Sequence, residues 1–358
     1  MNNHKTKIRG PLGPQAGKRR RAPRKKSGAA EPDGIGAYAA LDLGTNNCRL
    51  LVATPEGDSF RVVDAFSRIV RLGEGLEKTG RLTDAAMDRT ISALRVCASK
   101  MARKKVVRAR NVATEACRRA ANCAEFLGRI QEETGLEFEI ITPYEEARLA
   151  LSGCIPLLVE GYPYGIVFDI GGGSTEVMWV EIPGDGSVDV IETLSIPLGV
   201  VNLAEIHGGG EITEAQFETM VRVIAGELSD FETRNGITEA IGDGRVQMLG
   251  TSGTVTTLAG IHMGLPAYDR SVVDGCFLGF KEVATVTRHL MGLDFDGRAG
   301  EPCVGVLRAD LVVAGCAILE AICRTWDVGR LRVADRGVRE GILLGLMRLA
   351  ARPGTAEA

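Results

Sequence analysis

The chain has 358 residues, and its 43 Lys or Arg residues nearly balance its 46 Asp or Glu residues, which leaves a net charge of −3. The charge is unevenly distributed, because residues 1–30 contain 10 basic and no acidic residues. No apolar run approaches the roughly 20 residues of a membrane-spanning helix, and no apolar segment follows the basic start. We therefore expect a cytoplasmic protein with an acidic body, no membrane span and no secretory signal.

The basic N-terminal segment is expected to be disordered. Residues 1–34 are rich in Gly, Pro, Lys and Arg and hold few apolar side chains, so burial cannot offset the entropy lost on ordering. This tail is either a solvated extension or an element that recruits a polyanion, and we consider nucleic acid as a partner only here. The nine cysteines form no Cys-x-x-Cys pair, so we expect reduced, buried thiols.

A short apolar hairpin follows the tail. Tyr38–Leu43 and Cys48–Thr54 are apolar runs, and the polar residues Gly44–Asn47 separate them. Periodicity and capping signals then predict strands at 60–66, 106–113 and 138–141 and helices at 83–103 and 124–134. This alternation indicates an α/β fold.

A helix beginning at Pro143 carries two adjacent acidic residues. Thr142 and Glu145 have the spacing of a capping box, and Pro143 suits the first helical position. Glu146 lies about 100° further round the helix, so the cap does not use it and it is the better candidate for chemistry. The alternative is that both carboxylates only stabilise the helix N-terminus.

The pattern of strand, Asp-x-Gly turn and strand returns at Ile166–Val180. The segment that begins at Asp42 aligns without a gap to the segment that begins at Asp169, 127 residues further along the chain. A duplicated hairpin at this separation predicts two similar half-molecules that face one cleft.

Both turns have the composition of a phosphate site. Glycine allows an anion to approach closely, and successive backbone N–H groups form a nest for it. We therefore expect phosphate contacts from Gly44, Thr45, Asn46, Gly171, Gly172, Gly173, Ser174 and Thr175. Asp42 and Asp169 begin the two turns, where a carboxylate suits a Mg²⁺ ligand. A single glycine turn is commonly structural, but two matched turns favour a phosphate cleft.

A third glycine element lies at Gly250–Thr254, between an expected strand and an expected helix. Helix N–H groups there can hold an anion, which would place Gly253 and Thr254 at the site, although a plain tight turn is the alternative. An arginine can bind phosphate oxygens with a pair of hydrogen bonds, so the arginines near these motifs are candidate phosphate contacts. Most arginines are nevertheless solvated surface charges. Further helices are expected at 213–236, 281–291 and 303–322.

Together these motifs resemble the exopolyphosphatase/guanosine pentaphosphate phosphatase (Ppx/GppA) family, a branch of the actin, Hsp70 and sugar-kinase superfamily. The resemblance covers residues 36–350 and rests on Asp42-Leu-Gly-Thr-Asn-Asn, Ala113-Thr-Glu-Ala-Cys-Arg, Glu145-Glu-Ala-Arg, Asp169-Ile-Gly-Gly-Gly-Ser-Thr-Glu and Asp335-Arg-Gly-Val-Arg-Glu-Gly. It implies an α/β fold in which duplicated ribonuclease H-like domains of the actin type flank a central cleft. The first turn departs from the family's usual Gly-Ser-Asn-Ser by ending in Asn47.

The resemblance also implies roles for single residues. Glu146 corresponds to the family's water-activating glutamate, and Arg118 corresponds to its phosphate-gripping arginine. The metal ligands fall on Asp169 and Glu176, with Asp42 opposite. The implied cofactor is Mg²⁺, with Mn²⁺ as the alternative. Further phosphate contacts are implied for Arg49 and Arg270.

By resemblance to the short members of the family, we expect actin-like domains at 35–144 and 145–335, with a C-terminal helix at 336–352 that packs back on the first. The implied activity is an exopolyphosphatase that releases orthophosphate from the ends of polyphosphate. The rival substrate is the 5′ end of guanosine pentaphosphate. A hypothesis of another class is a switch that senses such ligands without turnover. A homodimer is a further expectation, since relatives are commonly dimeric.

Overall fold

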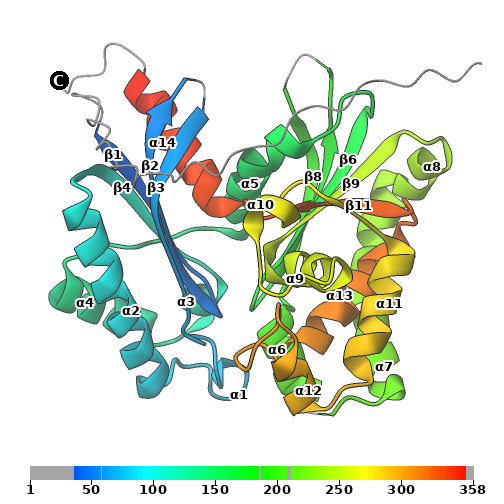
Figure 1. Cartoon of the computed structure of the whole chain (residues 1–358), viewed down its shortest axis with the longest axis horizontal. Coiled ribbons are helices and arrows are strands. Elements are labelled where there is room, and N and C mark those ends of the chain that lie inside the picture. The colour runs from blue at the N-terminus through cyan, green and yellow to red at the C-terminus, as the bar shows by residue number, and fades with distance from the viewer. Residues whose placement is uncertain (1–35, 58, 185–186, 208–210, 352–358) are drawn as a thin grey trace, which may run out of the picture. The chain divides into compact units, whose positions relative to one another are not determined.

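The computed structural model describes residues 36–57, 59–184, 187–207 and 211–351. Two mixed β-sheets, each flanked by helices, make up this part of the chain (Figure 1). No helix in the described ranges is both long enough and apolar enough to cross a membrane. The tail expected to be disordered, residues 1–34, lies outside the described residues.

The first sheet has the strand order β3-β2-β1-β4-β5. Its strands are β1 (Ala37–Leu43), β2 (Asn47–Glu56), β3 (Ser59–Ile69), β4 (Val106–Ala113) and β5 (Glu139–Ile140). The helices of this half are α1 (Leu76–Thr79), α2 (Asp84–Arg103), α3 (Glu115–Arg119), α4 (Cys123–Thr134) and α5 (Pro143–Cys154). The strands and helices predicted for residues 38–141 are therefore confirmed, with shifts of a few residues at their ends.

The second sheet has the strand order β10-β11-β9-β6-β7-β8. Its strands are β6 (Tyr164–Ile170), β7 (Thr175–Glu181), β8 (Asp189–Ile196), β9 (Val246–Thr251), β10 (Phe277–Gly279) and β11 (Arg330–Ala334). The helical segments that follow α5 are η1 (Ile155–Leu157), α6 (Val200–His207), α7 (Glu214–Asn235), α8 (Ile237–Gly242), α9 (Ser252–His262), α10 (Arg270–Val273), α11 (Phe280–Met291), α12 (Phe295–Gly300), α13 (Val312–Thr325) and α14 (Val338–Ala351).

Alternation along β1 explains why the first sheet is covered on both faces. Ala39 and Leu41 point into a core that α2 and α4 complete, whereas Tyr38 and Ala40 point into a core that α5 and α14 complete. Side chains of a strand alternate between the two faces, so a strand that is apolar at every position is buried on both.

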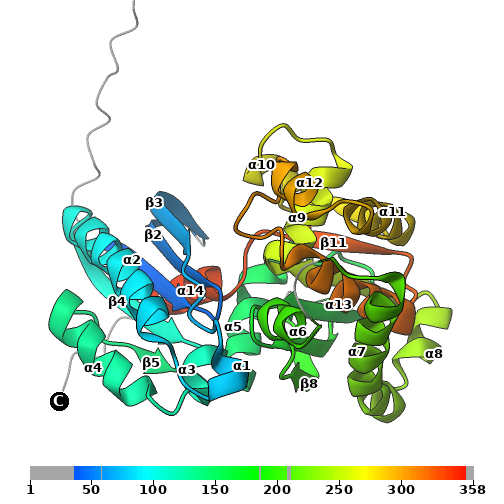
Figure 2. The ribbon, with the colours of Figure 1, turned by 90° about the horizontal axis from the view of Figure 1, so that it is seen from below.

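Helix α5 contributes to the cores of both sheets. Its Leu149 and Ala150 pack with β1, β2 and α14, while Ala147 and Leu151 pack with β6, β7 and β9. Figure 2 shows α5 and α14 side by side between the two sheets. The predicted domain boundary at residue 145 falls in the first turn of α5, so the helix that carries Glu146 is fixed by both halves.

The long helix predicted at 303–322 was wrong at its start, because α13 begins only at Val312. Gly305 has a φ of +72°, and the chain before α13 forms successive i to i+3 turns, in which Arg308 N–H donates to Gly305 O. A left-handed residue interrupts a helix. The final helix also starts later than predicted, at Val338 instead of residue 336.

Glycines allow α5 and α14 to lie in close contact. A Cβ added to Gly341 of α14 would lie 2.0 Å from the carbonyl oxygen of Leu149 in α5. Gly153 of α5 makes the reciprocal approach, since its Cβ would lie 2.2 Å from the carbonyl oxygen of Gly337. Neither oxygen can move without shifting a backbone, so a side chain at either position separates the helices.

Gly341→Ala is predicted to lower the free energy of unfolding by about 1–3 kcal/mol, the range found for overpacked cores. The matched control is Gly345→Ala on the same helix, where an added Cβ meets nothing within 4 Å. Alanine is the better helix former, so that variant should gain up to about 1 kcal/mol. Urea denaturation measures both, and equal stabilities for the two variants would contradict the close contact.

Candidate functional site

The two hairpins place their first carboxylates in equivalent positions. In the first sheet Asp42 of β1 pairs with Arg49 of β2, and in the second Asp169 of β6 pairs with Glu176 of β7. Each hairpin therefore has the same register, with the Asp just before its turn. The predicted duplication is present in three dimensions.

The two turns touch each other. A Cβ on Gly172 would lie 3.0 Å from the backbone nitrogen of Asn46, and a Cβ on Gly173 would lie 2.6 Å from Thr45 Oγ1. In the described part of the chain, the N–H groups of Asn46, Gly172 and Gly173 have no hydrogen-bond acceptor. Thr45 Oγ1 is also buried without a partner there. Unpaired donors facing one gap form a site for an anion.

We call the gap between the turns the central cavity. It is lined by both glycine turns and by four carboxylates, Asp42, Glu115, Glu146 and Asp169. Of the predicted phosphate contacts, the cavity holds Gly44, Thr45, Asn46, Arg49, Gly171, Gly172, Gly173 and Ser174. The structure thus gathers residues from β1, β2, α5 and β6, together with the two turns, around one small space.

Glu146 faces this cavity and is held by an arginine. Its Oε2 accepts a hydrogen bond of 2.8 Å from Nη1 of Arg118, and the same Nη1 donates to the carbonyl oxygen of Ile141 at 2.9 Å. Arg118 also donates from Nε to Glu115 at 2.9 Å. Both Glu146 and Arg118 have 14% of their side-chain surface exposed, so the pair is shielded from bulk water, and of the two only Glu146 lines the cavity.

Crowding of buried carboxylates keeps their protons bound at unusually high pH. Burial raises the pKa of Glu146 to about 7, against the opposing effect of Arg118, and Asp42 and Asp169 raise it further. Burial likewise raises the pKa of Asp169 to about 6, with Arg49 opposing and Asp42 adding to the shift. The pKa of Asp42 is raised for the same reason. Removal of water and like charge are the usual causes of such shifts.

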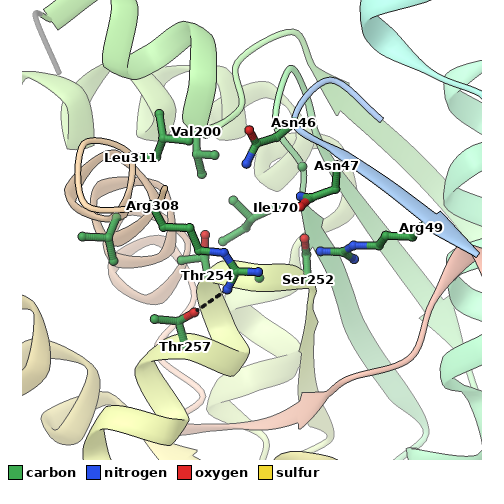
Figure 3. A pocket seen from close by; sticks show the side chains of 14 residues that line it. Asn46, Asn47, Arg49, Ile170, Val200, Ser252, Thr254, Thr257, Arg308 and Leu311 are labelled. Carbon is green, nitrogen blue, oxygen red and sulfur yellow. Dashed lines mark hydrogen bonds between the residues drawn. The ribbon is translucent and has the colours of Figure 1, made fainter. Parts of the chain in front are cut away.

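A second space, the arginine cavity, adjoins the central cavity and is shown in Figure 3. Arg49 and Arg308 point into it from opposite sides, and the first residues of α9, Ser252 to Thr254, form its floor. Arg308 donates to Thr257 Oγ1 at 3.3 Å, and no carboxylate pairs with it among the described residues. Two unneutralised guanidinium groups at a helix N-terminus attract an anion.

Ser252 is the strained point where the cavities meet. Its φ of +83° is left-handed, which is unfavourable for a residue other than glycine. Ser252 and Arg49 line the central cavity, the arginine cavity and a third space formed by Asp335 to Glu340. Strain of this kind is typically found at functional sites, where surrounding contacts hold the residue in place.

The carboxylates fit a cation held by two protein ligands. Asp42 and Asp169 line two of the cavities together, and each raises the pKa of a carboxylate in the site by its charge. Mg²⁺ commonly takes one or two carboxylates and completes its octahedron with water and phosphate oxygens. No group of three or more Asp, Glu, His or Cys side chains in the described ranges could hold a metal on its own.

Four predicted site residues lie outside these cavities. Arg118 lines none of them and meets the central cavity only through its bond to Glu146. Glu176 is buried behind the second turn, where its Oε1 accepts hydrogen bonds from Ser174 at 2.7 Å and Ser195 at 3.1 Å. Thr175 Oγ1 donates to the carbonyl oxygen of Leu198. Arg270 is paired with Glu340 at 2.9 Å and Asp335 at 3.5 Å, so its charge is neutralised away from the turns.

The capping box predicted at α5 forms only by half. Thr142 Oγ1 accepts from the backbone N–H of Glu145 at 3.2 Å, as expected. The side chain of Glu145 does not return to Thr142, because it pairs with Arg110 of β4. The distinction drawn between the two acidic residues still holds, since Glu146 lines the central cavity and Glu145 does not.

Sequence reasoning missed Ser252 and Arg308. Ser252 stood inside the Gly250–Thr254 element, but its neighbours Gly253 and Thr254 were preferred as anion contacts; both line the arginine cavity with it. Arg308 was placed within the helix predicted at 303–322 and was given no role at the site. Only the turn at Gly305, with its positive φ, could have indicated that Arg308 lies in a loop.

Comparisons with known proteins agree with this geometry. The model of the Ppx/GppA phosphatase family matches residues 51–350. Exopolyphosphatase 2 of Mycobacterium tuberculosis is 30% identical over 322 residues, which cover 86% of this chain and 98% of that protein.

Among solved structures, a Ppx/GppA family member from Aquifex aeolicus has 29% identity and a TM-score of 0.72, covering 89% of this chain and 100% of its own. An exopolyphosphatase-like protein has 28% identity and a TM-score of 0.81, covering 88% and 99%. The predicted duplicated, ribonuclease H-like fold is confirmed.

The raised pKa of Asp169 predicts a stability difference that depends on pH. The folded chain keeps this proton up to about pH 6, whereas the ordinary pKa is 3.8, so the stabilisation is present below pH 3.8 and is lost as the pH rises to about 6. An asparagine at this position has no proton to lose. Relative to the wild type, the unfolding free energy of Asp169→Asn should therefore rise by about 2–3 kcal/mol over this window.

Urea denaturation at several pH values, without divalent cations, measures this difference. Glu192→Gln is the control, because Arg234 lowers the pKa of half-buried Glu192 and the pH dependence has the opposite sign. A stability difference for Asp169→Asn that stays constant from pH 4 to pH 7 would contradict the burial of this carboxylate.

Proposed function

Because this chain belongs to the Ppx/GppA phosphatase family, we propose that it hydrolyses terminal phosphoanhydride bonds and releases orthophosphate from the ends of inorganic polyphosphate. The relative from Mycobacterium tuberculosis, named an exopolyphosphatase, supports this choice of substrate. The observation that carries the proposal is the position of Glu146, which borders the same cavity as Asn46, Gly172 and Gly173, whose N–H groups have no acceptor among the described residues.

The terminal phosphoryl group binds between the two turns. The unpaired N–H groups of Asn46, Gly172 and Gly173 donate to its oxygens, with the hydroxyl of Thr45. The rest of the chain extends into the arginine cavity, where Arg49 and Arg308 face each other without carboxylate partners. Preorganised donors of this kind stabilise charge on phosphoryl oxygens without having to reorient.

Glu146 then acts as the general base. It orients a water molecule in line with the terminal phosphorus and accepts a proton from it as the new P–O bond forms. The bond from phosphorus to the bridging oxygen breaks, and the shortened chain leaves as an oxyanion. The pKa of Glu146, about 7, suits a base that works near neutral pH. Arg118 keeps the carboxylate oriented and lies near enough to offset charge on the phosphoryl group.

A divalent cation is part of the proposal, with Mg²⁺ preferred over Mn²⁺. Asp42 and Asp169 would hold it, and it would neutralise negative charge on the phosphate oxygens. Glu176 is not assigned as a direct ligand, because its Oε1 accepts from two serine hydroxyls. Glu176 instead fixes Ser174 in the second turn.

Guanosine pentaphosphate remains the second candidate substrate. Ile170, Val200 and Leu311 give the arginine cavity an apolar wall, which polyphosphate does not need and a nucleoside could contact. The ratio of kcat/KM for tripolyphosphate and guanosine pentaphosphate decides between them. We expect the ratio to exceed one, and a ratio well below one would assign the nucleotide as the substrate.

Glu146→Gln is predicted to lower kcat by about 10²–10⁴-fold, the usual contribution of a general base, while the protein still binds tripolyphosphate. Glutamine keeps the shape and a hydrogen bond from Arg118 but cannot accept the proton. Phosphate release and calorimetric binding are the two measurements. The matched control is Glu145→Gln, which alters the adjacent carboxylate that pairs with Arg110 outside the cavity.

Two outcomes would contradict this assignment. Near-normal turnover in Glu146→Gln would remove the residue from catalysis. If the wild-type protein binds tripolyphosphate but hydrolyses no phosphoanhydride with Mg²⁺ present, the chain is a sensing switch and not an enzyme.

A further inference from the structure

We propose that Arg71 is a positioning residue, which sets the distance between the first glycine turn and Arg308 by pairing with Asp310 across the cleft. The inference rests on the proposed function, because it assigns Arg71 a role in holding the phosphate chain. Arg71 does not line the central cavity or the arginine cavity, so it would act through the residues it holds.

The backbone around Arg71 is tied to the first turn. The N–H groups of Val70 and Arg71 both donate to the carbonyl oxygen of Asn46, at 2.9 and 3.0 Å. Gly73 N–H donates to the carbonyl oxygen of Thr45 at 2.9 Å. These bonds use the turn's carbonyl groups and leave the N–H group of Asn46 without an acceptor among the described residues. The segment from Val70 to Gly75 therefore moves with the first turn.

The side chain of Arg71 crosses to the second half of the molecule. Its Nη2 donates to Asp310 Oδ1 at 2.7 Å and to the carbonyl oxygen of Leu307 at 3.1 Å. About a quarter of each charged side chain is exposed, 26% for Arg71 and 27% for Asp310, so water screens the pair only in part. Arg71 holds a left-handed φ of +49°, which is unusual for arginine and shows that the surrounding contacts determine its conformation.

Leu307 and Asp310 flank Arg308 in the turn that precedes α13. The carbonyl oxygen of Arg308 accepts from the N–H groups of Leu311 and Val312, which fixes its backbone to the start of that helix. Arg71 bonds to two residues of the same turn, Leu307 and Asp310, and the guanidinium of Arg308 points into the arginine cavity (Figure 3). The distance from the first turn to Arg308 is therefore spanned by one side chain.

A second bond supports the same segment. Gly75 N–H donates to Oε1 of Glu205 in α6 at 2.9 Å. The N-terminus of α6 is in turn bonded to the second glycine turn, since the N–H groups of Val200 and Val201 donate to the carbonyl oxygens of Gly171 and Gly172. Residues 70–75 are thus bonded directly to the first turn and to the Arg308 turn, and to the second turn through α6, and Arg71 is the side chain that reaches Arg308's neighbours.

A direct role for Arg71 in binding phosphate is the alternative, and Asp310 separates the two. If Arg71 positions Arg308, then Asp310→Asn weakens the pairing and harms binding as Arg71→Gln does. If Arg71 contacts phosphate directly, then Asp310→Asn frees the guanidinium and binding stays equal or improves.

The experiment measures binding of orthophosphate and tripolyphosphate by calorimetry, with and without the Glu146→Gln substitution, together with steady-state kinetics. We expect Arg71→Gln and Asp310→Asn each to weaken tripolyphosphate binding and raise KM by about tenfold, with a smaller change in kcat. Orthophosphate, which needs only the central cavity, should bind to each variant within about twofold of its affinity for the wild type.

The double variant should be no worse than either single variant, because both substitutions remove the same pairing of Arg71 with Asp310. Arg71→Lys should be intermediate, since a lysine keeps the positive charge but lacks the planar, pre-organised guanidinium.

The matched control is Arg89→Gln. Arg89 supports the same segment by donating to the carbonyl oxygens of Val70 and Arg71 and to Glu74, but it does not reach the Arg308 turn. An equal loss in Arg89→Gln would reduce Arg71 to a general support of the segment and overturn the proposal. So would unchanged or tighter binding in Asp310→Asn, or additive effects in the double variant.

Failure of the proposed function is distinguishable from failure of this inference. A wild-type protein that binds tripolyphosphate without turnover ends the enzymatic proposal, yet the binding series still tests Arg71. A wild-type protein that binds no tripolyphosphate overturns both.

Discussion

The contact between the two glycine turns is the constraint on which the rest of the site depends. Each turn belongs to a hairpin of its own sheet, and their unpaired N–H groups can converge on one anion only if the turns approach within van der Waals distance. Gly172 permits this approach, because a Cβ there would lie 3.0 Å from the nitrogen of Asn46. Helices α5 and α14 also meet through glycines, and they pack between the two sheets.

The electrostatics of the site follow from that closeness. The body of the protein is acidic, and Asp42, Glu146 and Asp169 all border the central cavity. A polyphosphate could not bind there without compensation. The compensation comes from backbone N–H groups, from Arg49 and Arg308, and from a cation at the aspartates. Burial raises the pKa of Glu146 to about 7, and the charges of Asp42 and Asp169 add to this shift, so the groups that oppose an anion also help to make this carboxylate a suitable base.

Local sequence patterns were sufficient for the hairpins, and they made Glu146 a candidate, but only the family resemblance gave Glu146 a role. The Asp-x-Gly turns recur with the same spacing, and the cap at Thr142 accounted for the backbone of Glu145 and left Glu146 available. Arginine roles could not be predicted in this way, because an arginine's partners come from distant segments. Arg270 is neutralised by Glu340 and Asp335. No carboxylate among the described residues pairs with Arg308, but the sequence placed Arg308 inside a predicted helix that in the structure begins only after it. Glu176 matched the family's metal motif, yet serine hydroxyls occupy its Oε1.

The most direct test of this account is the affinity of Gly172→Ala for tripolyphosphate. The added Cβ would meet the backbone of Asn46 and hold the turns apart, whereas Gly226→Ala, on an open face of α7, adds a Cβ with nothing within 4 Å. We expect Kd to rise at least about tenfold in Gly172→Ala, equivalent to about 1.4 kcal/mol, with Gly226→Ala unchanged. A folded Gly172→Ala protein that binds tripolyphosphate with the wild-type Kd would show that the contact between the turns does not form the phosphate site.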